Sequence, residues 1–97
     1  MPVMVRWKVH ADQVGPELAM LREVYDELAA AEIDGLRYAT YRLEDGVSFL
    51  DVVDLPQGPG MLRQIAAFGR YRSGLEERCV EPPVVTQLEE VGAYRFP

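Results

Sequence analysis

The feature that most constrains this chain is the dipeptide Asp45-Gly46, which separates two segments with strand-like alternation, 36–43 and 47–53. Asp-Gly in this setting is typical of a β-hairpin, because a type I′ turn requires positive φ at both central residues. The turn sets the register of the two strands and places Thr40 opposite Asp51 and Arg42 opposite Phe49. The hairpin therefore has two faces whose composition is readable from the sequence.

The two faces of this hairpin differ in polarity. One is mostly apolar and carries Ala39, Tyr41, Leu43, Leu50 and Val52. The other mixes polar, charged and aromatic groups, namely Tyr38, Thr40, Arg42, Phe49, Asp51 and Val53. We expect the first face to lie in the core. We expect the second to form an open face that is solvated, covered by a second subunit or part of a ligand cavity.

The remainder of the chain contains two further strand patterns and two helix patterns. Residues 3–9 alternate, with Trp7 on the apolar side, and predict a half-buried strand. Apolar residues at helical spacing follow Pro16 and continue to Asp34-Gly35. A second helix is predicted over 61–79, weakened by Gly69 and Ser73-Gly74 and ended by the prolines at 82–83. A fourth strand is predicted over 84–91, with neither face clearly apolar, and 92–97 form a short arm.

This order, βαββαβ, predicts a single α+β domain over residues 1–97. The favoured arrangement is a ferredoxin-like plait, in which two helices cover one face of a four-stranded antiparallel sheet. Right-handed crossovers place the first and third strands side by side in the middle of the sheet. Met4, Arg6, Lys8 and His10 of the first strand then join the mixed face of the hairpin on the open side.

Composition excludes several classes of function. The net charge is −6 and Lys8 is the only lysine, so the chain lacks the clustered cations that bind nucleic acid or an anionic membrane. No apolar run approaches a membrane span and no signal peptide is recognisable, which predicts a cytoplasmic protein. The lone Cys79 has no CxxC or histidine-rich neighbour, so we expect neither a disulfide nor a metal site.

The element order and several short segments resemble the antibiotic-biosynthesis-monooxygenase-like proteins of the dimeric α-β barrel superfamily. The segments are Arg6-Trp7-Lys8-Val9, Gly35-Leu36-Arg37-Tyr38 and the stretch 85–92. The resemblance implies a homodimer in which two plaits pack their open faces together around a cavity. It does not extend to the haem-degrading members, whose pattern has an asparagine on the first strand, a tryptophan on the third and a histidine on the second helix. This chain has no asparagine, carries Asp51 or Val53 at the tryptophan position, and has no histidine over 61–79.

Two residues are candidate proton acceptors. His10 is one, because histidine is the side-chain type whose charge commonly changes near neutrality, although a histidine at a strand end is also typical of a solvated loop. Asp51 lies in the middle of a central strand, where a carboxylate requires a partner, so it is either ion-paired with Arg42, Arg6 or Lys8 or a base or anchor in a cavity.

Six residues are candidates for binding a substrate. Arg6, Lys8 and Arg42 bring positive charge that stabilises oxyanions, or they bridge to a partner subunit. Tyr38 and Phe49 offer aromatic surface to a ligand or to an interface, and Thr40 lies beside them.

Together with these candidate residues, the resemblance implies a cofactor-independent, monooxygenase-like enzyme that acts on a small aromatic or polyketide-like molecule. The alternative is a non-catalytic homodimeric module that binds a ligand or a protein. A cavity reached by Asp51 favours the enzyme, whereas an interface without a void, with Asp51 neutralised by an arginine, favours the module.

Overall fold

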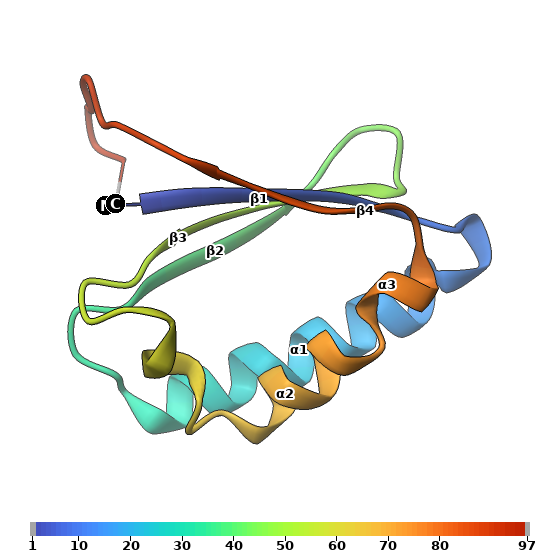
Figure 1. The fold of residues 1–97 in the computed structure, drawn as a ribbon, viewed down its shortest axis with the longest axis horizontal. Helices are drawn as coiled ribbons and strands as arrows, with labels where there is room; N and C mark the ends of the chain where they lie inside the picture. Colours follow the sequence, from blue (N-terminus) through green and yellow to red (C-terminus); the bar gives the residue numbers. More distant parts are fainter. Residues whose placement is uncertain (1, 97) are drawn as a thin grey trace.

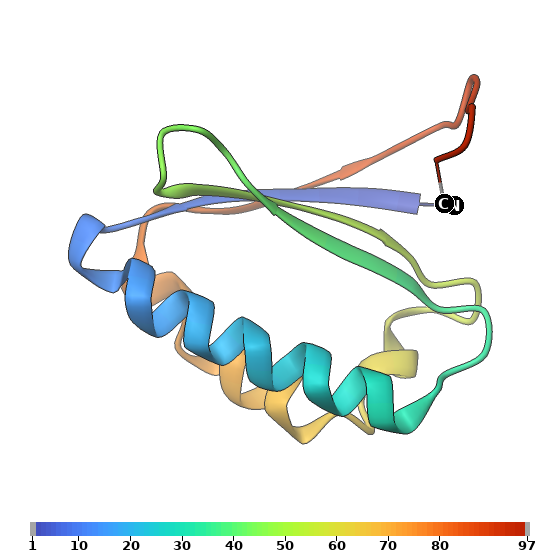
Figure 2. The ribbon, with the colours of Figure 1, turned by 180° about the vertical axis from the view of Figure 1, so that it is seen from behind.

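The computed structural model describes residues 2–96 and shows a sheet with all its helices on one side (Figures 1 and 2). The four strands are β1 (Pro2–Val9), β2 (Arg37–Arg42), β3 (Ser48–Asp54) and β4 (Cys79–Gln87). The helices are α1 (Val14–Ala31), α2 (Ala66–Ser73) and α3 (Leu75–Arg78), with 3-10 turns η1 (Ala11–Gln13) and η2 (Pro59–Leu62). The strands are antiparallel in the order β2-β3-β1-β4, so the predicted ferredoxin-like plait is confirmed.

The register predicted for the hairpin is confirmed, but its turn is not of type I′. Thr40 pairs with Asp51 and Arg42 with Phe49. Gly46 has φ of 79°, whereas Asp45 does not have a positive φ. Its carboxylate instead accepts hydrogen bonds from the backbone N–H groups of Val47 and Ser48 and from the Ser48 hydroxyl. A longer loop closed by an Asp side chain therefore produces the same register as the shorter turn.

The prediction of which hairpin face is buried is wrong. Phe49, Asp51 and Val53 are buried beneath the helices, whereas Tyr41 is 43% exposed on the opposite face. Phe49 stacks on Trp7, with ring centroids 5.6 Å apart, so the mixed face of the hairpin and the apolar face of β1 share one side of the sheet. The polar groups on this face are tolerated because they hydrogen-bond to one another and to α1.

The open face of the sheet is accordingly more apolar than predicted. It carries Met4, Arg6 and Lys8 of β1, as expected, together with the alternate residues of the other strands. These are Ala39, Tyr41, Leu50, Val52 and, from β4, Val84 and Thr86. Most of them are exposed or half-buried.

Two boundaries in the C-terminal third differ from the prediction. The second helix divides at Gly74 into α2 and α3, and it begins later than expected because 59–62 form a 3-10 turn. Strand β4 begins at Cys79 and includes both prolines. Prolines are tolerated there because β4 is an edge strand and its pairing with β1 shifts register between Arg6 and Lys8.

The core contains a buried ion pair that the sequence analysis did not anticipate. Glu17 of α1 is fully buried and accepts hydrogen bonds from Arg78 Nε at 2.9 Å, Tyr71 Oη at 2.8 Å and Trp7 Nε1 at 3.0 Å. The Arg78 guanidinium also donates to the Tyr71 carbonyl and lies over its ring. The charges are therefore compensated, and the cluster ties α1 to β1, α2 and α3.

None of the helices within residues 2–96 has the length and apolar character needed to span a bilayer.

Candidate functional site

The sheet separates the residues that the sequence analysis placed in one site. Tyr38, Thr40 and Asp51 lie together on the helix-facing side. Arg6 and Lys8 lie on the open face, and Arg42 donates from Nε to the Gly46 carbonyl in the hairpin loop. No ion pair joins Asp51 to any of these cations among the described residues.

Phe49 and His10 also fall outside the site. Phe49 is 1% exposed and belongs to the core with Trp7, so it offers no surface to a ligand. His10 is exposed after the end of β1. Asp51 pairs with Val5, and His10 lies five positions further along the chain, roughly 16 Å at the rise of a strand, so His10 is far from Asp51.

Four side chains form a continuous hydrogen-bonded network between α1 and the sheet. Thr40 Oγ1 donates to Asp51 Oδ1 at 2.6 Å, and Tyr38 Oη donates to Asp51 Oδ2 at 3.1 Å. Tyr25 Oη of α1 lies 2.6 Å from Thr40 Oγ1. Since Thr40 has one hydroxyl proton and gives it to Asp51, Tyr25 is the donor in this last bond. We call Tyr25, Tyr38, Thr40 and Asp51 the hydroxyl network.

Burial sets the protonation behaviour of this network. Desolvation raises the pKa of Asp51 from 3.8 to about 6, partly opposed by the hydrogen bonds from Thr40 and Tyr38. Desolvation also raises the pKa values of Tyr25 and Tyr38 well above the ordinary value for tyrosine, and the Asp51 charge adds to both shifts. The two tyrosines therefore remain neutral hydroxyl donors at physiological pH, while Asp51 exchanges a proton near neutrality.

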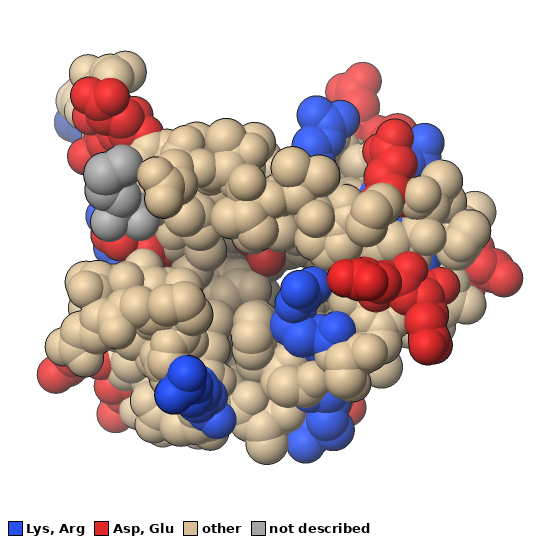
Figure 3. Space-filling view, viewed as in Figure 1, with Lys and Arg blue, Asp and Glu red and all other residues tan. Residues whose placement is uncertain are grey.

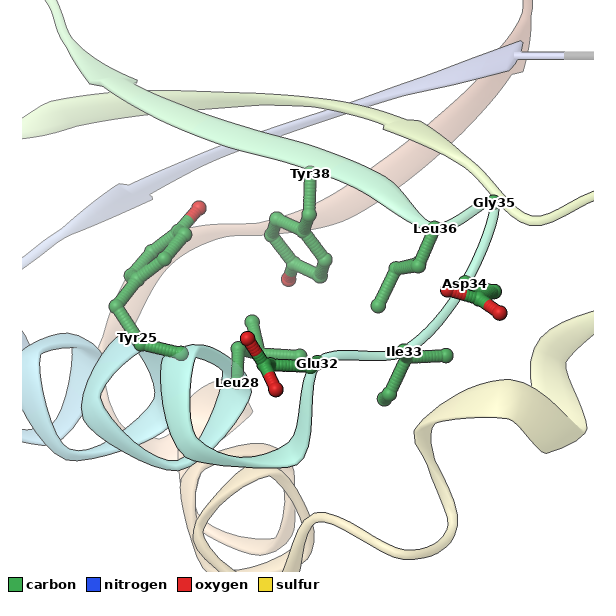
Figure 4. Close-up of a pocket in the computed structure, with 9 residues that line it drawn as sticks. Tyr25, Leu28, Glu32, Ile33, Asp34, Gly35, Leu36 and Tyr38 are labelled. Carbon is green, nitrogen blue, oxygen red and sulfur yellow. The ribbon is translucent and has the colours of Figure 1, made fainter.

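A cleft of about 560 Å³ reaches the two tyrosines from outside (Figure 4). It lies where α1 ends and the chain enters β2, and we call it the helix-end cleft. Its lining consists of Tyr25, Leu28, Ala29, Glu32, Ile33, Asp34, Gly35, Leu36 and Tyr38. The two tyrosine rings meet edge to face, with centroids 5.6 Å apart, and Figure 4 shows Tyr25 rising from α1 while Tyr38 descends from β2. Thr40 and Asp51 do not line the cleft, so they are reached through the tyrosines.

Tyr25 and the loop 32–36 were not predicted from the sequence as parts of this site. Tyr25 lies within the helix pattern predicted after Pro16, at a spacing typical of core residues. Its hydroxyl is the one sequence feature that could have indicated its role, because a partly buried Tyr hydroxyl needs a polar partner. In the structure that partner is Thr40. No sequence motif marks the loop 32–36 as part of the cleft, because its position there depends on where α1 ends.

Within residues 2–96, no three side chains of the types His, Cys, Asp or Glu gather closely enough to hold a metal ion. Cys79 is partly buried, and desolvation raises the pKa of its thiol, which disfavours the reactive thiolate.

Comparison with solved structures shows that this fold is shared across most of the chain. The structure of Rv0793 from Mycobacterium tuberculosis is 23% identical, covers 94% of this chain and 97% of its own, and superposes with a TM-score of 0.70. A structure named antibiotic biosynthesis monooxygenase is 12% identical, covers 94% and 98% of the two chains, and has a TM-score of 0.73. A variant of SnoaB, a cofactor-independent oxygenase from Streptomyces nogalater, is 13% identical, covers 93% of each chain, and has a TM-score of 0.61.

At these sequence identities, the structural similarity establishes a shared fold. The expected resemblance to antibiotic-biosynthesis-monooxygenase-like proteins is therefore confirmed as a common architecture. No family model matches the sequence, and no curated protein matches it either.

Proposed function

We propose that this chain is a cofactor-independent oxygenase that deprotonates a small phenolic or related aromatic molecule in the helix-end cleft. The observation that carries this proposal is the hydroxyl network, which links the cleft to a buried carboxylate whose pKa is raised to about 6. A base with such a pKa accepts a proton efficiently near pH 7. The fold shared with the cofactor-independent oxygenase SnoaB is consistent with this chemistry.

The network provides a route for the proton from the cleft to Asp51. With Asp51 ionised, the donors point inward, from Tyr25 to Thr40 and from Thr40 to Asp51. When the substrate gives a proton to the Tyr25 oxygen, Tyr25 passes its own proton to Thr40. Thr40 in turn passes its proton to Asp51. Tyr38 offers a shorter route, because it lines the cleft and donates directly to Asp51.

The same transfer prepares the site to hold the substrate anion. Once Asp51 is protonated, it donates to Thr40, Thr40 donates to Tyr25, and the Tyr25 O–H is free to point into the cleft. A neutral hydroxyl aimed at a developing oxyanion stabilises it. The anion of a phenol then reacts with dioxygen at a ring carbon that carries hydrogen. One oxygen atom becomes the second carbonyl group of a quinone, and the other leaves as water with the phenolic hydrogen and that ring hydrogen. For an anthrone-type methylene, one oxygen atom enters the new carbonyl group and the other leaves as water with the two methylene hydrogens.

Oxygen consumption with simple hydroquinones and anthrones tests this proposal. Asp51→Asn is expected to lower the rate by roughly 100-fold or more, because it removes the proton acceptor. The wild-type rate is expected to rise with pH through an apparent pKa of about 6. Asp26→Asn, at an exposed position of α1, is the control for loss of one negative charge.

The same assays decide between this proposal and its alternatives. Full activity in Asp51→Asn, or loss of activity in His10→Ala, contradicts the role given to the network. Binding of phenols without turnover across a broad panel favours the ligand-binding module.

We infer further that a second copy of the chain covers the open sheet face. Val84 is 61% exposed and Tyr41 is 43% exposed there, beside half-buried Met4, Leu50 and Val52. Such a face is costly to leave in water. Sedimentation is expected to show a homodimer, and Leu50→Lys is expected to produce monomers. A wild-type monomer at micromolar concentration contradicts this inference.

A further inference from the structure

The outer part of the helix-end cleft is negatively charged. Its lining includes Glu32 and Asp34 but no lysine, arginine or histidine. Both carboxylates are exposed, and neither forms an ion pair within residues 2–96. In Figure 4 they lie on opposite sides of Ile33, Glu32 near Leu28 and Asp34 near Gly35. A positively charged group at the rim would therefore meet two unpaired carboxylates.

An adjoining cleft extends this negative rim. It has a volume of about 500 Å³, shares Glu32, Ile33 and Asp34 with the helix-end cleft, and also lacks a cationic residue. Gln57 and Gln64 add amide groups to its lining. The face shown in Figure 3 differs, because several basic side chains lie over the helix layer there, beside a hollow between the helices and the sheet. The lack of cations is thus a property of the rim and not of the whole helix layer.

The end of α1 adds to the negative potential at the rim. The C-terminus of a helix carries partial negative charge and commonly has a basic residue nearby. The last turn of α1 has no basic residue, and Glu32 occupies its C-cap position. Glu32 adopts the left-handed conformation, with φ of 47° and ψ of 59°, and its N–H donates to the Leu28 carbonyl. A carboxylate therefore stands at a strained position where a glycine would be the ordinary choice.

We propose that the molecule bound in the helix-end cleft is a phenol that carries a cationic substituent such as a protonated amine. The proposal rests on the proposed function and specifies its substrate class. The phenol ring lies against Tyr25 and Tyr38, with its hydroxyl toward the hydroxyl network. The ammonium group lies at the rim between Glu32 and Asp34, where it also meets the negative end of α1.

Three phenols with the same ring and different charge test the proposal. Tyramine carries an ammonium group, 4-propylphenol replaces it with a methyl group, and 3-(4-hydroxyphenyl)propionate replaces it with a carboxylate. Dissociation constants are measured at pH 7 by ligand-observed NMR titration. The expected order of affinity is tyramine, then 4-propylphenol, then the propionate.

Variants separate the rim charge from other causes of this order. Each of Glu32→Gln and Asp34→Asn is expected to reduce the preference for tyramine over 4-propylphenol by about 1.4- to 5-fold, the range of exposed ion pairs. Raising the salt concentration is expected to reduce it as well. Glu44→Gln, which removes an exposed carboxylate in the hairpin loop, is the matched control and is expected to leave the preference unchanged.

The outcomes distinguish this inference from the proposed function. If 4-propylphenol binds but the preference for tyramine is absent or survives in Glu32→Gln and Asp34→Asn, the charge inference is wrong and the proposed function stands. If none of the three phenols binds, the cleft is not the substrate site and both proposals fail. If tyramine is preferred through the rim but no phenol is turned over, the inference about the ligand holds and the oxygenase does not.

Discussion

Replacement of Asp51 by asparagine is expected to stabilise the protein at neutral pH. The folded state raises the pKa of Asp51 from 3.8 to about 6, so ionised Asp51 is less favourable in the folded protein than in the unfolded chain. Each pKa unit corresponds to about 1.4 kcal/mol, and a shift of roughly two units amounts to about 3 kcal/mol. Asparagine carries no charge, and the hydroxyls of Thr40 and Tyr38 can rotate to donate to it or accept from it.

The sign of this effect gives it a distinctive pH dependence. A carboxyl whose folded pKa is raised contributes stability below its unfolded pKa, and this stability is lost as pH rises through the folded pKa. The free energies of unfolding of Asp51→Asn and wild type should therefore agree below about pH 4 and diverge between pH 4 and 6. Above pH 6 the variant should be more stable by up to about 3 kcal/mol, which is a rise in Tm of roughly 12 to 24 °C for a domain of this size.

Urea denaturation across pH 3.5 to 8 measures this difference. Asp26→Asn, at an exposed position, corrects for the change in net charge. A 13C NMR titration of the Asp51 carboxyl gives its pKa independently. A stability difference that is the same at pH 4 and pH 7, or a carboxyl that titrates near 4, would contradict this prediction.

Three further predictions concern stability alone. Arg78→Met should lower the free energy of unfolding by about 3 to 5 kcal/mol, because it leaves Glu17 charged and unpaired in the core. Adding Glu17→Gln to this variant should recover part of the lost stability, and the absence of any recovery would contradict the explanation. Gly46→Ala should lower the free energy of unfolding by about 1 kcal/mol, because Gly46 has φ of 79°. Gly69→Ala, in α2 with open space around it, should raise the free energy of unfolding by up to about 1 kcal/mol, and thermal unfolding measures both changes. The hydrogen bonds from Ser48 and Val47 lower the pKa of Asp45 to about 2. Asp45→Ala should therefore be less stable than wild type above pH 4, and its stability should approach that of wild type as pH falls through 2. An equal loss of stability at every pH would contradict this prediction.

The sequence predicted the elements and their order because these depend on local patterns. Alternation with a period of two identified the hairpin, and its register was correct even though the turn was assigned to the wrong type. The start of β4 was misplaced because prolines were interpreted as breakers. Whether a proline breaks a strand depends on whether its neighbour needs the missing N–H, and an edge strand does not need it on its outer side.

The faces of the hairpin could not be assigned from polarity alone. Thr40 and Asp51 appear unsuited to a core when each is considered separately. They are buried because they satisfy each other's hydrogen bonds and because Tyr25, fifteen residues away in sequence from Thr40, supplies another. Asp51 could therefore be singled out from the sequence as a carboxylate in an unusual position, whereas its surroundings required knowledge of which helix lies over it.

The ion pair between Glu17 and Arg78 joins residues 61 positions apart in sequence. During synthesis on the ribosome, Glu17 leaves the exit tunnel long before the arginine that neutralises it has been translated. A nascent chain that lacks the last fifth of the sequence would have to bury an uncompensated carboxylate in order to close its core. Closure of the native core is therefore expected to follow synthesis of the C-terminal segment that carries Arg78.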